Sequence, residues 1–341
     1  MTPVFERAPR ISVNILIVKP TALGDVAQAL RVAPLLKKKG FCTQLDWLVD
    51  EDYIPLVRFC PEVNNIIPFP RRAWSERFSP FNILQWAYDL RMRHYDIVID
   101  LQGLARSGIM TWLTASVRCV GLKSSREGAQ LAYSEMVDDH QEHAIDRYKA
   151  AVEYLLEEPV AIKTKLSTDD PLQTPFNLPK FGYTVLHPYS NWNTKIWPWR
   201  YYQKLVDAMP HERFVLVGQG DFFPCFGPNL IDVRNRTDVA GLIEILRGAK
   251  VVISTDSGPA HIAAAFDRPL VTLFGSTDEL KTAPRAKYSK ILSNSIECRP
   301  CLKRLCKHKK VMGCMEFILL EDVIDAHAQV INLSENNLVT T

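Results

Sequence analysis

The chain has 341 residues, of which 47% are hydrophobic and 23% are charged, a composition typical of a globular protein with enough apolar side chains for two cores. Its formal net charge of +3 is too small to indicate a nucleic-acid partner. No run approaches the roughly 20 apolar residues that span a bilayer, and the N-terminus lacks the ordered regions of a signal peptide. We therefore expect a cytoplasmic protein, either free or peripheral to the inner face of a membrane.

The first half of the chain alternates short apolar runs with longer helical ones. Residues 13–18 predict a strand, and residues 25–39 predict a helix that Pro34 kinks or ends early. Two further strands are predicted at 44–49 and 96–101. The second of these is almost entirely apolar, which is typical of a parallel sheet covered on both faces.

A polar stretch with four prolines between residues 157 and 180 is typical of a linker. The alternation of strands and helices then resumes. Strands are predicted at 183–187, 214–217, 251–255 and 270–274, and helices at 199–209, 239–247, 259–266 and 321–331.

Strands that alternate with helices at this spacing predict βα units and a parallel sheet. We therefore predict an α/β protein of two doubly wound, Rossmann-like parallel-sheet domains that face a central cleft, where ligands of such sheets bind. The predicted boundaries are residues 1–165 for the N-terminal domain, 166–182 for the linker and 183–341 for the C-terminal domain.

The first predicted strand is followed directly by the sequence KPTALGDV, which contains Gly24 and Asp25. A glycine lets the chain turn sharply at the end of the strand, and Asp25 then lies at or near the first turn of a helix. From position alone we favour an N-cap carboxylate, worth about 1 kcal/mol, over a general base at a cleft-facing strand end. The segment is not a dinucleotide fingerprint, because it contains no GxGxxG.

The sequence TDSGPAH joins an apolar strand to a helix rich in alanine. Pro259 suits the first position of that helix, and Ser257 and Gly258 expose backbone N–H groups at its N-terminus, where the helix dipole favours an anion. A well-capped helix needs no ligand, but Asp256 and His261 together exceed what a cap requires. The segment therefore indicates a diphosphate site.

Two other strand ends of the second half carry polar residues. The loop after the predicted strand 183–187 holds Ser190 and Lys195; a lysine there neutralises phosphate oxygens, and an ordinary surface lysine is the alternative. Asp221 follows the strand 214–217 and offers a carboxylate to ribose hydroxyls, although a plain turn explains that segment by itself. Three consecutive strand ends thus favour a nucleotide diphosphate as the ligand.

The first half contains a segment that mixes cations and aromatic rings, FPRRAWSERF, with Arg71 and Arg72. It suits a phosphorylated, lipid-linked acceptor at a membrane surface, whereas a solvated basic loop is the simpler alternative. The acidic triplet at 50–52 has the DxD spacing that holds a divalent metal in other enzymes. We interpret this triplet as an acidic strand end that faces solvent.

The eight cysteines fall into two groups. Four are scattered among apolar residues and are expected to be buried side chains: Cys42, Cys60, Cys119 and Cys225. The other four have the spacing C-x2-C-x4-C-x7-C, which suits a structural tetrahedral site for zinc or iron: Cys298, Cys301, Cys306 and Cys314. Reduced thiols without a metal stay open as the alternative in a cytosolic protein.

These motifs together make the chain similar to the bacterial ADP-heptose:lipopolysaccharide heptosyltransferases, glycosyltransferase family 9. The resemblance runs through most of the chain, in the segments KPTALGDV, LDWLVDEDY, VNNIIPFPRRAW, YDIVIDLQGLARSG, SSREGAQLAYS, EHAIDRYKAAVEYL, TKIWPWRYYQKL and STDSGPAHIAAAFDRPLVTLFGSTD. Several N-terminal segments resemble the enzyme that adds the first heptose. CRPCLKRLC is similar to segments near the C-terminus of those that add the second.

The resemblance implies a GT-B fold and an inverting transfer of heptose from ADP-heptose to a lipid-linked saccharide, the lipopolysaccharide inner core, in peripheral contact with the inner membrane face. No metal or other cofactor is required for catalysis in that family. Asp25 matches the family's catalytic aspartate, which replaces the cap interpretation. The matching donor-binding residues are Ser190, Lys195, Asp221, Asp256, Ser257, Gly258 and His261, and the matching acceptor-binding residues are Arg71, Arg72, Arg126 and Arg147. Asp221 stands where the family commonly has a longer glutamate.

Three alternatives stay open at this point. The first is another GT-B glycosyltransferase that uses a different nucleotide sugar or a protein acceptor. The second is a non-catalytic protein that binds sugar nucleotides or a membrane surface, and the third is a sugar-nucleotide epimerase. Assays against a panel of donors, with and without an acceptor, separate the four.

Overall fold

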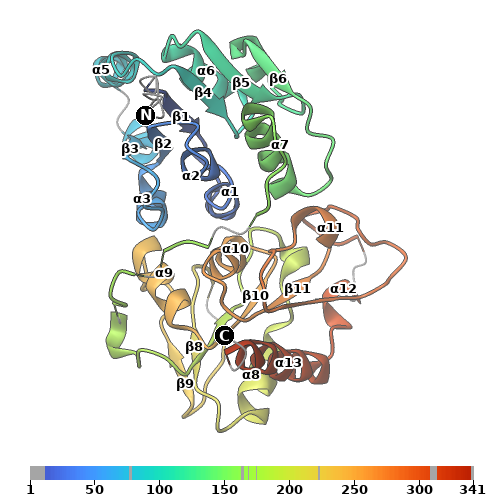
Figure 1. Cartoon of the computed structure of the whole chain (residues 1–341). Helices are drawn as coiled ribbons and strands as arrows, with labels where there is room; N and C mark the ends of the chain where they lie inside the picture. Colours follow the sequence, from blue (N-terminus) through green and yellow to red (C-terminus); the bar gives the residue numbers. More distant parts are fainter. Residues whose placement is uncertain are drawn as a thin grey trace, which may run out of the picture. The chain divides into compact units, whose positions relative to one another are not determined.

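The computed structural model describes residues 12–76, 79–162, 165–167, 169–173, 175–221, 223–307 and 313–338. Within these residues the chain divides into two compact units. Unit 1 contains residues 12–21, 32–141 and 145–162, and unit 2 contains residues 22–31, 142–144 and 165–338 with the gaps just given. Each unit is built on a parallel sheet of its own (Figure 1). Residues 1–11, on which the expectation of no signal peptide depends, lie outside the described residues.

The sheet of unit 1 has six parallel strands in the order β3-β2-β1-β4-β5-β6. Its central strands are short apolar runs whose side chains are buried on both faces, and Leu16, Val18 and Val98 belong to the core. The strands are β1 (Asn14–Val18), β2 (Gln44–Asp50), β3 (Asn65–Phe69), β4 (Ile97–Asp100), β5 (Arg118–Leu122) and β6 (Glu135–Val137).

Short helices connect these strands. Helix α5 begins where Ser79 accepts a hydrogen bond from the N–H of Asn82 at 3.4 Å, with Pro80 in the first helical position. The helices of this half are α2 (Leu35–Lys38), α3 (Ile54–Val57), α4 (Arg71–Glu76), α5 (Pro80–Arg91), α6 (Ala105–Leu113) and α7 (Ala144–Leu156), with the 3₁₀ turns η1 (Glu51–Tyr53) and η2 (Ala129–Ala132).

The sheet of unit 2 repeats the same topology. Its order is β12-β11-β10-β7-β8-β9, all parallel, so the strand order reverses between β7 and β10 just as it does between β1 and β4 in unit 1. The strands are β7 (Thr184–His187), β8 (Phe214–Leu216), β9 (Leu230–Asp232), β10 (Val251–Thr255), β11 (Leu270–Phe274) and β12 (Ser289–Ser293).

Helices pack on this second sheet through alternate strand residues. Val251 and Ile253 of β10 share a core with Leu205 of α8 and Val330 of α13, and α10 also contacts β10 and β11. The helices of unit 2 are α1 (Leu23–Ala29), α8 (Trp199–Ala208), α9 (Val239–Gly248), α10 (Gly258–Ala265), α11 (Glu279–Thr282), α12 (Gly313–Glu316) and α13 (Leu320–Leu338), with η3 (Pro175–Asn177) and η4 (Asn193–Lys195).

The predicted fold class, two doubly wound parallel sheets, is confirmed. The helix predicted at 25–39 is two helices, because the chain forms turns at 30–34 and Pro34 becomes the N-cap of α2. The proline-rich stretch at 166–182 is part of unit 2 in its described residues, and the N–H of Leu166 donates to the carbonyl oxygen of Ala265 at 3.0 Å.

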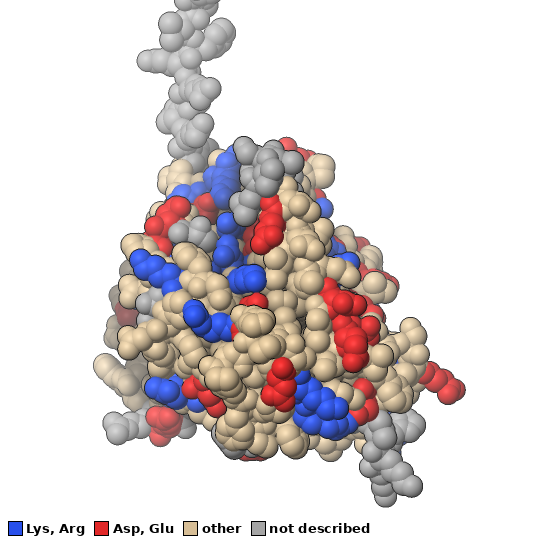
Figure 2. Space-filling view, turned by 90° about the horizontal axis from the view of Figure 1, so that it is seen from below, with Lys and Arg blue, Asp and Glu red and all other residues tan. Residues whose placement is uncertain are grey.

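The surface carries both signs of charge. Acidic and basic side chains are interspersed on the face of the molecule that Figure 2 shows, in keeping with the small net charge. Within the described parts of the chain, no helix has the length and apolar character needed to cross a membrane.

Candidate active site

The reversal of strand order in unit 2 brings two loops together. Ligands of open parallel sheets bind beyond the carboxyl ends of the strands at such a point. Strand β7 ends at His187 and is followed by the loop with Ser190 and Lys195, while β10 ends at Thr255 and is followed by Asp256. Because β7 and β10 are hydrogen-bonded neighbours, these two loops emerge side by side.

A buried carboxylate lies at the centre of this edge. The Nζ of Lys195 is 2.7 Å from Oδ2 of Asp256, and their side chains are only 15% and 5% exposed. The hydroxyl of Thr277, in the turn after β11, donates to the same oxygen at 2.7 Å. The ammonium also lies 4.8 Å from the ring centroid of Trp192. The lysine charge is thus largely desolvated and held in one place, where it can meet phosphate oxygens.

The turn that starts α10 is held by a neutral histidine. The Nδ1 of His187 lies 3.1 Å from Oγ of Ser257, the N-cap of α10, and 3.3 Å from Oγ of Ser254. Complete burial lowers the pKa of His187 to about 4, so its ring is uncharged at neutral pH. It therefore orients the serine hydroxyls without adding a charge, and the helix N-terminus keeps its preference for an anion.

Helix α1 packs directly on α10. Gly24 is the point of contact, since a Cβ placed on it would lie 2.8 Å from Cδ2 of His261 and 3.2 Å from Cα of Gly258. The next residue, Asp25, is half-buried in the third position of α1, and Ala22 is the N-cap. The cap interpretation of Asp25 is therefore wrong in its position, although its Oδ2 does lie 3.4 Å from the N–H of Ala22.

The predicted base and the predicted donor turn thus belong to one cluster. Burial lowers the pKa of His261, and the carboxylates of Asp256 and Asp25 oppose that shift. The Nδ1 of His261 is buried without a hydrogen-bond partner in the described structure, which is uncommon for a buried polar atom.

Replacing Gly24 by alanine is expected to move α1 away from α10. The resemblance implies that Asp25 is a catalytic base, and a displacement near 1 Å costs on the order of a hundredfold in rate when it misplaces such a group. On that basis we expect kcat to fall about 10- to 100-fold in Gly24→Ala and further in Gly24→Val. Steady-state kinetics on purified variants check this. A Gly24→Val variant with the wild-type kcat contradicts the close approach.

Asp221 lies on an exposed loop after β8. Its carbonyl oxygen accepts a hydrogen bond from the hydroxyl of Tyr189 at 2.9 Å. The tyrosine ring also fills the space above Gly218 and Gly220, where added Cβ atoms would lie 2.4 and 2.6 Å from ring carbons. The two glycines are therefore explained by Tyr189, and the role of Asp221 beside a ribose stays a prediction.

In unit 1, two arginines face a buried carboxylate. The Nη1 of Arg71 lies 3.9 Å from Oδ2 of Asp50, and the guanidinium of Arg106 lies 5.8 Å from the ring centroid of Phe69. Burial raises the pKa of Asp50, while both arginines oppose the shift. Our interpretation of residues 50–52 as facing solvent is wrong for Asp50, which is buried and accepts a hydrogen bond from the N–H of Asp52 at 3.2 Å.

The other predicted acceptor arginines have different surroundings. Arg72 is exposed and lies 3.9 Å from Glu76 of the same helix, a pairing worth little at a surface. Arg126 is exposed in the loop after β5. Arg147 donates to the buried carboxylate of Asp139 at 2.8 Å, so its guanidinium also holds α7 to the loop after β6.

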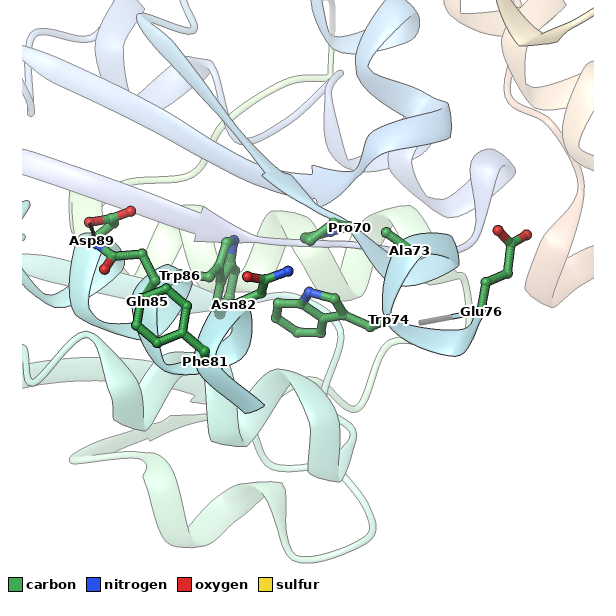
Figure 3. A pocket seen from close by; sticks show the side chains of 9 residues that line it. All are labelled: Pro70, Ala73, Trp74, Glu76, Phe81, Asn82, Gln85, Trp86 and Asp89. Atoms are coloured by element: carbon green, nitrogen blue, oxygen red, sulfur yellow. Dashed lines mark hydrogen bonds between the residues drawn. The ribbon is translucent and has the colours of Figure 1, made fainter. Parts of the chain in front are cut away.

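A hollow of about 630 Å³ opens beside α4 and α5 (Figure 3). The rings of Trp74 and Trp86 meet edge to face in its wall, with centroids 5.4 Å apart. Since α4 begins with Arg71 and Arg72, the hollow adjoins predicted acceptor residues. It is lined by Pro70, Ala73, Trp74, Glu76, Phe81, Asn82, Gln85, Trp86 and Asp89.

The model of one protein family, glycosyltransferase family 9 (heptosyltransferase), matches residues 83–221 and 225–312, more than half of the chain. The chain belongs to glycosyltransferase family 9. It is therefore a glycosyltransferase, and the sequence resemblance is confirmed.

Individual relatives agree with this membership. Lipopolysaccharide heptosyltransferase 1 of Pseudomonas aeruginosa is 27% identical over 320 residues, which cover 87% of this chain and 88% of the relative. Among solved structures, Escherichia coli heptosyltransferase WaaC with ADP-2-deoxy-2-fluoro heptose is 26% identical, with a TM-score of 0.65 over 82% of this chain and 93% of that one. E. coli ADP-heptose lps heptosyltransferase II, 17% identical, has a TM-score of 0.76 over 95% and 100% of the two chains. The fold is the GT-B fold.

The sequence reasoning assigned no role to three side chains of this family 9 enzyme. Thr277 is hydrogen-bonded to Asp256, and His187 is hydrogen-bonded to Ser257. The charge of Arg106 opposes the rise in the pKa of Asp50. His187 ends a predicted strand, Thr277 follows one, and Arg106 lies in the first turn of the helix after one. Their positions at strand ends could therefore have indicated them. Motif matching alone did not, because none of the three was singled out by its residue type.

The cysteines are all free thiols. The scattered four are buried, as predicted. Of the late four, Cys298 is exposed and Cys314 is buried, and burial together with the three other sulfurs raises the pKa of Cys314. Among the described residues, which include all four, no group of three or more His, Cys, Asp or Glu side chains is placed to hold a metal ion. The hypothesis of a structural zinc or iron there gains no support from the geometry.

Proposed function

We propose that this chain transfers heptose from ADP-heptose to the inner core of a lipopolysaccharide acceptor, with inversion at the anomeric carbon. The observation that carries the proposal is the packing of α1, which bears Asp25, against α10, whose N-terminal turn adjoins Lys195 and Asp256. A general base and a diphosphate site are needed in one cluster for this reaction. The names of the relatives, lipopolysaccharide heptosyltransferases, support the choice of donor and acceptor.

On the donor side, we propose that Lys195 and the N–H groups at Ser257 and Gly258 bind the diphosphate. As the bond between the anomeric carbon and the β-phosphate oxygen breaks, negative charge grows on ADP. A preorganised ammonium and a helix N-terminus stabilise that charge more than they stabilise the bound donor. Ser190, Asp221 and His261 complete the proposed donor site, with Asp221 near the ribose.

On the acceptor side, an acceptor hydroxyl attacks the anomeric carbon from the face opposite ADP. Its oxygen forms the new glycosidic bond and its proton passes to the carboxylate of Asp25. We propose that the N-terminal domain, residues 1–165, binds the acceptor and that residues 183–341 bind the donor. Guanidinium groups suit acidic sugars because they bind carboxylates and phosphates in pairs of hydrogen bonds. The proposed acceptor residues are Arg71, Arg72, Arg126 and Arg147.

A donor panel tests the proposal. Purified protein is incubated with ADP-heptose, UDP-sugars or GDP-sugars and with a heptose-deficient lipopolysaccharide, and mass spectrometry follows the acceptor. We expect a gain of one heptose from ADP-heptose alone. Transfer from a different nucleotide sugar, tight donor binding without turnover, or isomerised donor without an acceptor would each favour one of the alternatives and contradict the proposal.

The proposed chemistry needs no metal. Lys195 and the helix N-terminus supply the positive charge that a divalent cation supplies in other transferases. We therefore expect that dialysis against EDTA changes the transfer rate by less than twofold, and that added Mg²⁺ does not raise it. A rate that falls tenfold with EDTA and returns with one cation contradicts this mechanism. Metal analysis of the same samples tests the late cysteines independently.

We also propose that the enzyme works in the cytoplasm, in peripheral contact with the inner membrane face. Large apolar side chains that are more than half exposed support this: Phe81, Leu84 and Tyr88 on α5, Ile109 and Trp112 on α6, and Leu131 on η2. Helix α6 packs against both α5 and η2. Exposed patches of this kind mark interaction surfaces, and each element also carries or adjoins an exposed arginine: Arg91, Arg106 and Arg126.

Vesicle sedimentation tests this contact. We expect the protein to pellet with vesicles that contain phosphatidylglycerol. The double variant Trp112→Ser with Leu131→Ser should reduce the bound fraction at least tenfold, because each lost apolar side chain removes up to roughly 1.5–3 kcal/mol of insertion free energy. Leu280→Ser is the control, since Leu280 is 70% exposed in unit 2. Equal binding of both variants, or a wild-type dimer that the double variant dissociates, contradicts membrane contact through this face.

A further inference from the structure

Residues 298–303, which include Cys298 and Cys301, contact the loops of the predicted donor site. The N–H of Leu302 donates to the carbonyl oxygen of Ser276 at 2.9 Å. The hydroxyl of Thr194 donates to the carbonyl oxygen of Lys303 at 2.5 Å and lies 2.8 Å from the hydroxyl of Ser276. Three loops, those after β7 and β11 and residues 298–303, are thus joined by hydrogen bonds.

Arg299 is the most connected residue of that segment. Its Nε donates to the carbonyl oxygen of Gly275 at 2.5 Å, and its Nη2 donates to that of Thr277 at 3.2 Å. Its Nη1 donates to the carbonyl oxygen of Asn294 at 3.3 Å, and Nη2 pairs with Oε2 of Glu279 at 2.5 Å. The arginine side chain is 8% exposed. The guanidinium therefore holds both ends of the turn that follows β11.

The turn after β11 contacts the predicted donor site through the hydroxyl of Thr277. Thr277 donates to Oδ2 of Asp256, the oxygen that pairs with Lys195 at 2.7 Å. The turn has little room to shift, because a Cβ on Gly275 would lie 2.1 Å from the carbonyl oxygen of Thr194. A displacement at Arg299 is therefore passed to the carboxylate that orients the lysine.

We infer that Arg299 is a positioning residue for the diphosphate of the nucleotide donor, acting through Thr277 on the Asp256–Lys195 pair. This inference rests on the proposed function. The residue type fits the task, since a planar guanidinium serves several carbonyl oxygens at once and a lysine ammonium does not reproduce that geometry. The cysteine-rich segment then has a function that needs no metal, because its hydrogen bonds hold the turn after β11 that contacts the donor site.

Binding of ADP, measured by titration calorimetry, tests the inference. We expect Arg299→Gln and Arg299→Lys to raise the dissociation constant of ADP about tenfold and to raise KM for the donor, with KM for the acceptor unchanged. A purely structural arginine would lower the melting temperature without this split between the two substrates.

Arg268 provides a matched control. It too donates to backbone carbonyl oxygens, those of Phe266 and Arg247, each at 3.3 Å. It precedes β11, however, whereas Arg299 contacts the turn that follows this strand. We expect Arg268→Gln to lower the melting temperature and to leave ADP binding unchanged.

A double-mutant cycle with Thr277→Val tests whether Arg299 affects ADP binding through Thr277. If Arg299 acts through the threonine, Arg299→Gln changes the ADP dissociation constant less than twofold in the Thr277→Val background. A tenfold effect in both backgrounds overturns the inference, as does wild-type ADP affinity in Arg299→Gln. A wild-type protein that does not bind ADP contradicts the proposed function itself, which distinguishes the two failures.

Discussion

The Asp25→Asn variant is expected to lose about 10²- to 10⁴-fold in kcat, the range that a general base contributes. Asparagine has nearly the same shape but does not take a proton from the acceptor hydroxyl. Asp25 is half-buried in the third position of α1, where an amide is accommodated. ADP affinity and melting temperature should therefore stay close to those of the wild type, and radiometric or mass-spectrometric transfer assays should register the loss.

Asp52→Asn is the matched control for this variant. Asp52 is an exposed carboxylate that also follows a strand of the N-terminal half, and it belongs to the DxD triplet. We expect normal transfer, since neither a base nor a metal ligand is assigned there. Near-normal kcat in a folded Asp25→Asn protein would remove the base from the mechanism, and a large loss in Asp52→Asn would return attention to the triplet.

The central strands could be predicted from the sequence nearly to the residue. Strands β10 and β11 have the predicted bounds, because a strand buried on both faces must be a continuous apolar run. Strands β3, β5, β6, β9 and β12 were not predicted. They are edge or near-edge strands: β3 contains Pro68, β5 contains Arg118 and Gly121, β6 and β9 have three residues each, and β12 is half-exposed, so neither period nor length marks them.

The residues of the candidate site that lie at strand ends could be predicted from the sequence. The contacts that arise from packing between helices could not. Lys195 and Asp256 could be placed together because parallel strands deliver their loops to one edge, and the structure pairs them at 2.7 Å. Gly24 was interpreted as a turn residue, yet the structure gives it a contact with His261. No local pattern reveals a contact between residues that far apart in the chain.

The second large effect is expected for Lys195→Gln. Removing a preorganised charge that faces the leaving group costs about 10²- to 10³-fold in kcat. The same change leaves the buried carboxylate of Asp256 without its cation, with only the hydroxyl of Thr277 still donating to Oδ2. We therefore also expect a loss of about 1–3 kcal/mol in the free energy of unfolding, measured by urea denaturation.

The double variant Lys195→Gln with Asp256→Asn separates these two effects. An amide at 256 carries no charge, so the cost of an unpaired buried carboxylate disappears and most of the unfolding free energy should return. Transfer should stay as low as in the single variant, because the ammonium that meets the diphosphate is still missing. If activity recovered together with stability, the lysine would act only as the structural counterion of Asp256. The charge on the departing ADP would then have to be stabilised by the N–H groups at the start of α10, with no contribution from a side-chain cation at residue 195.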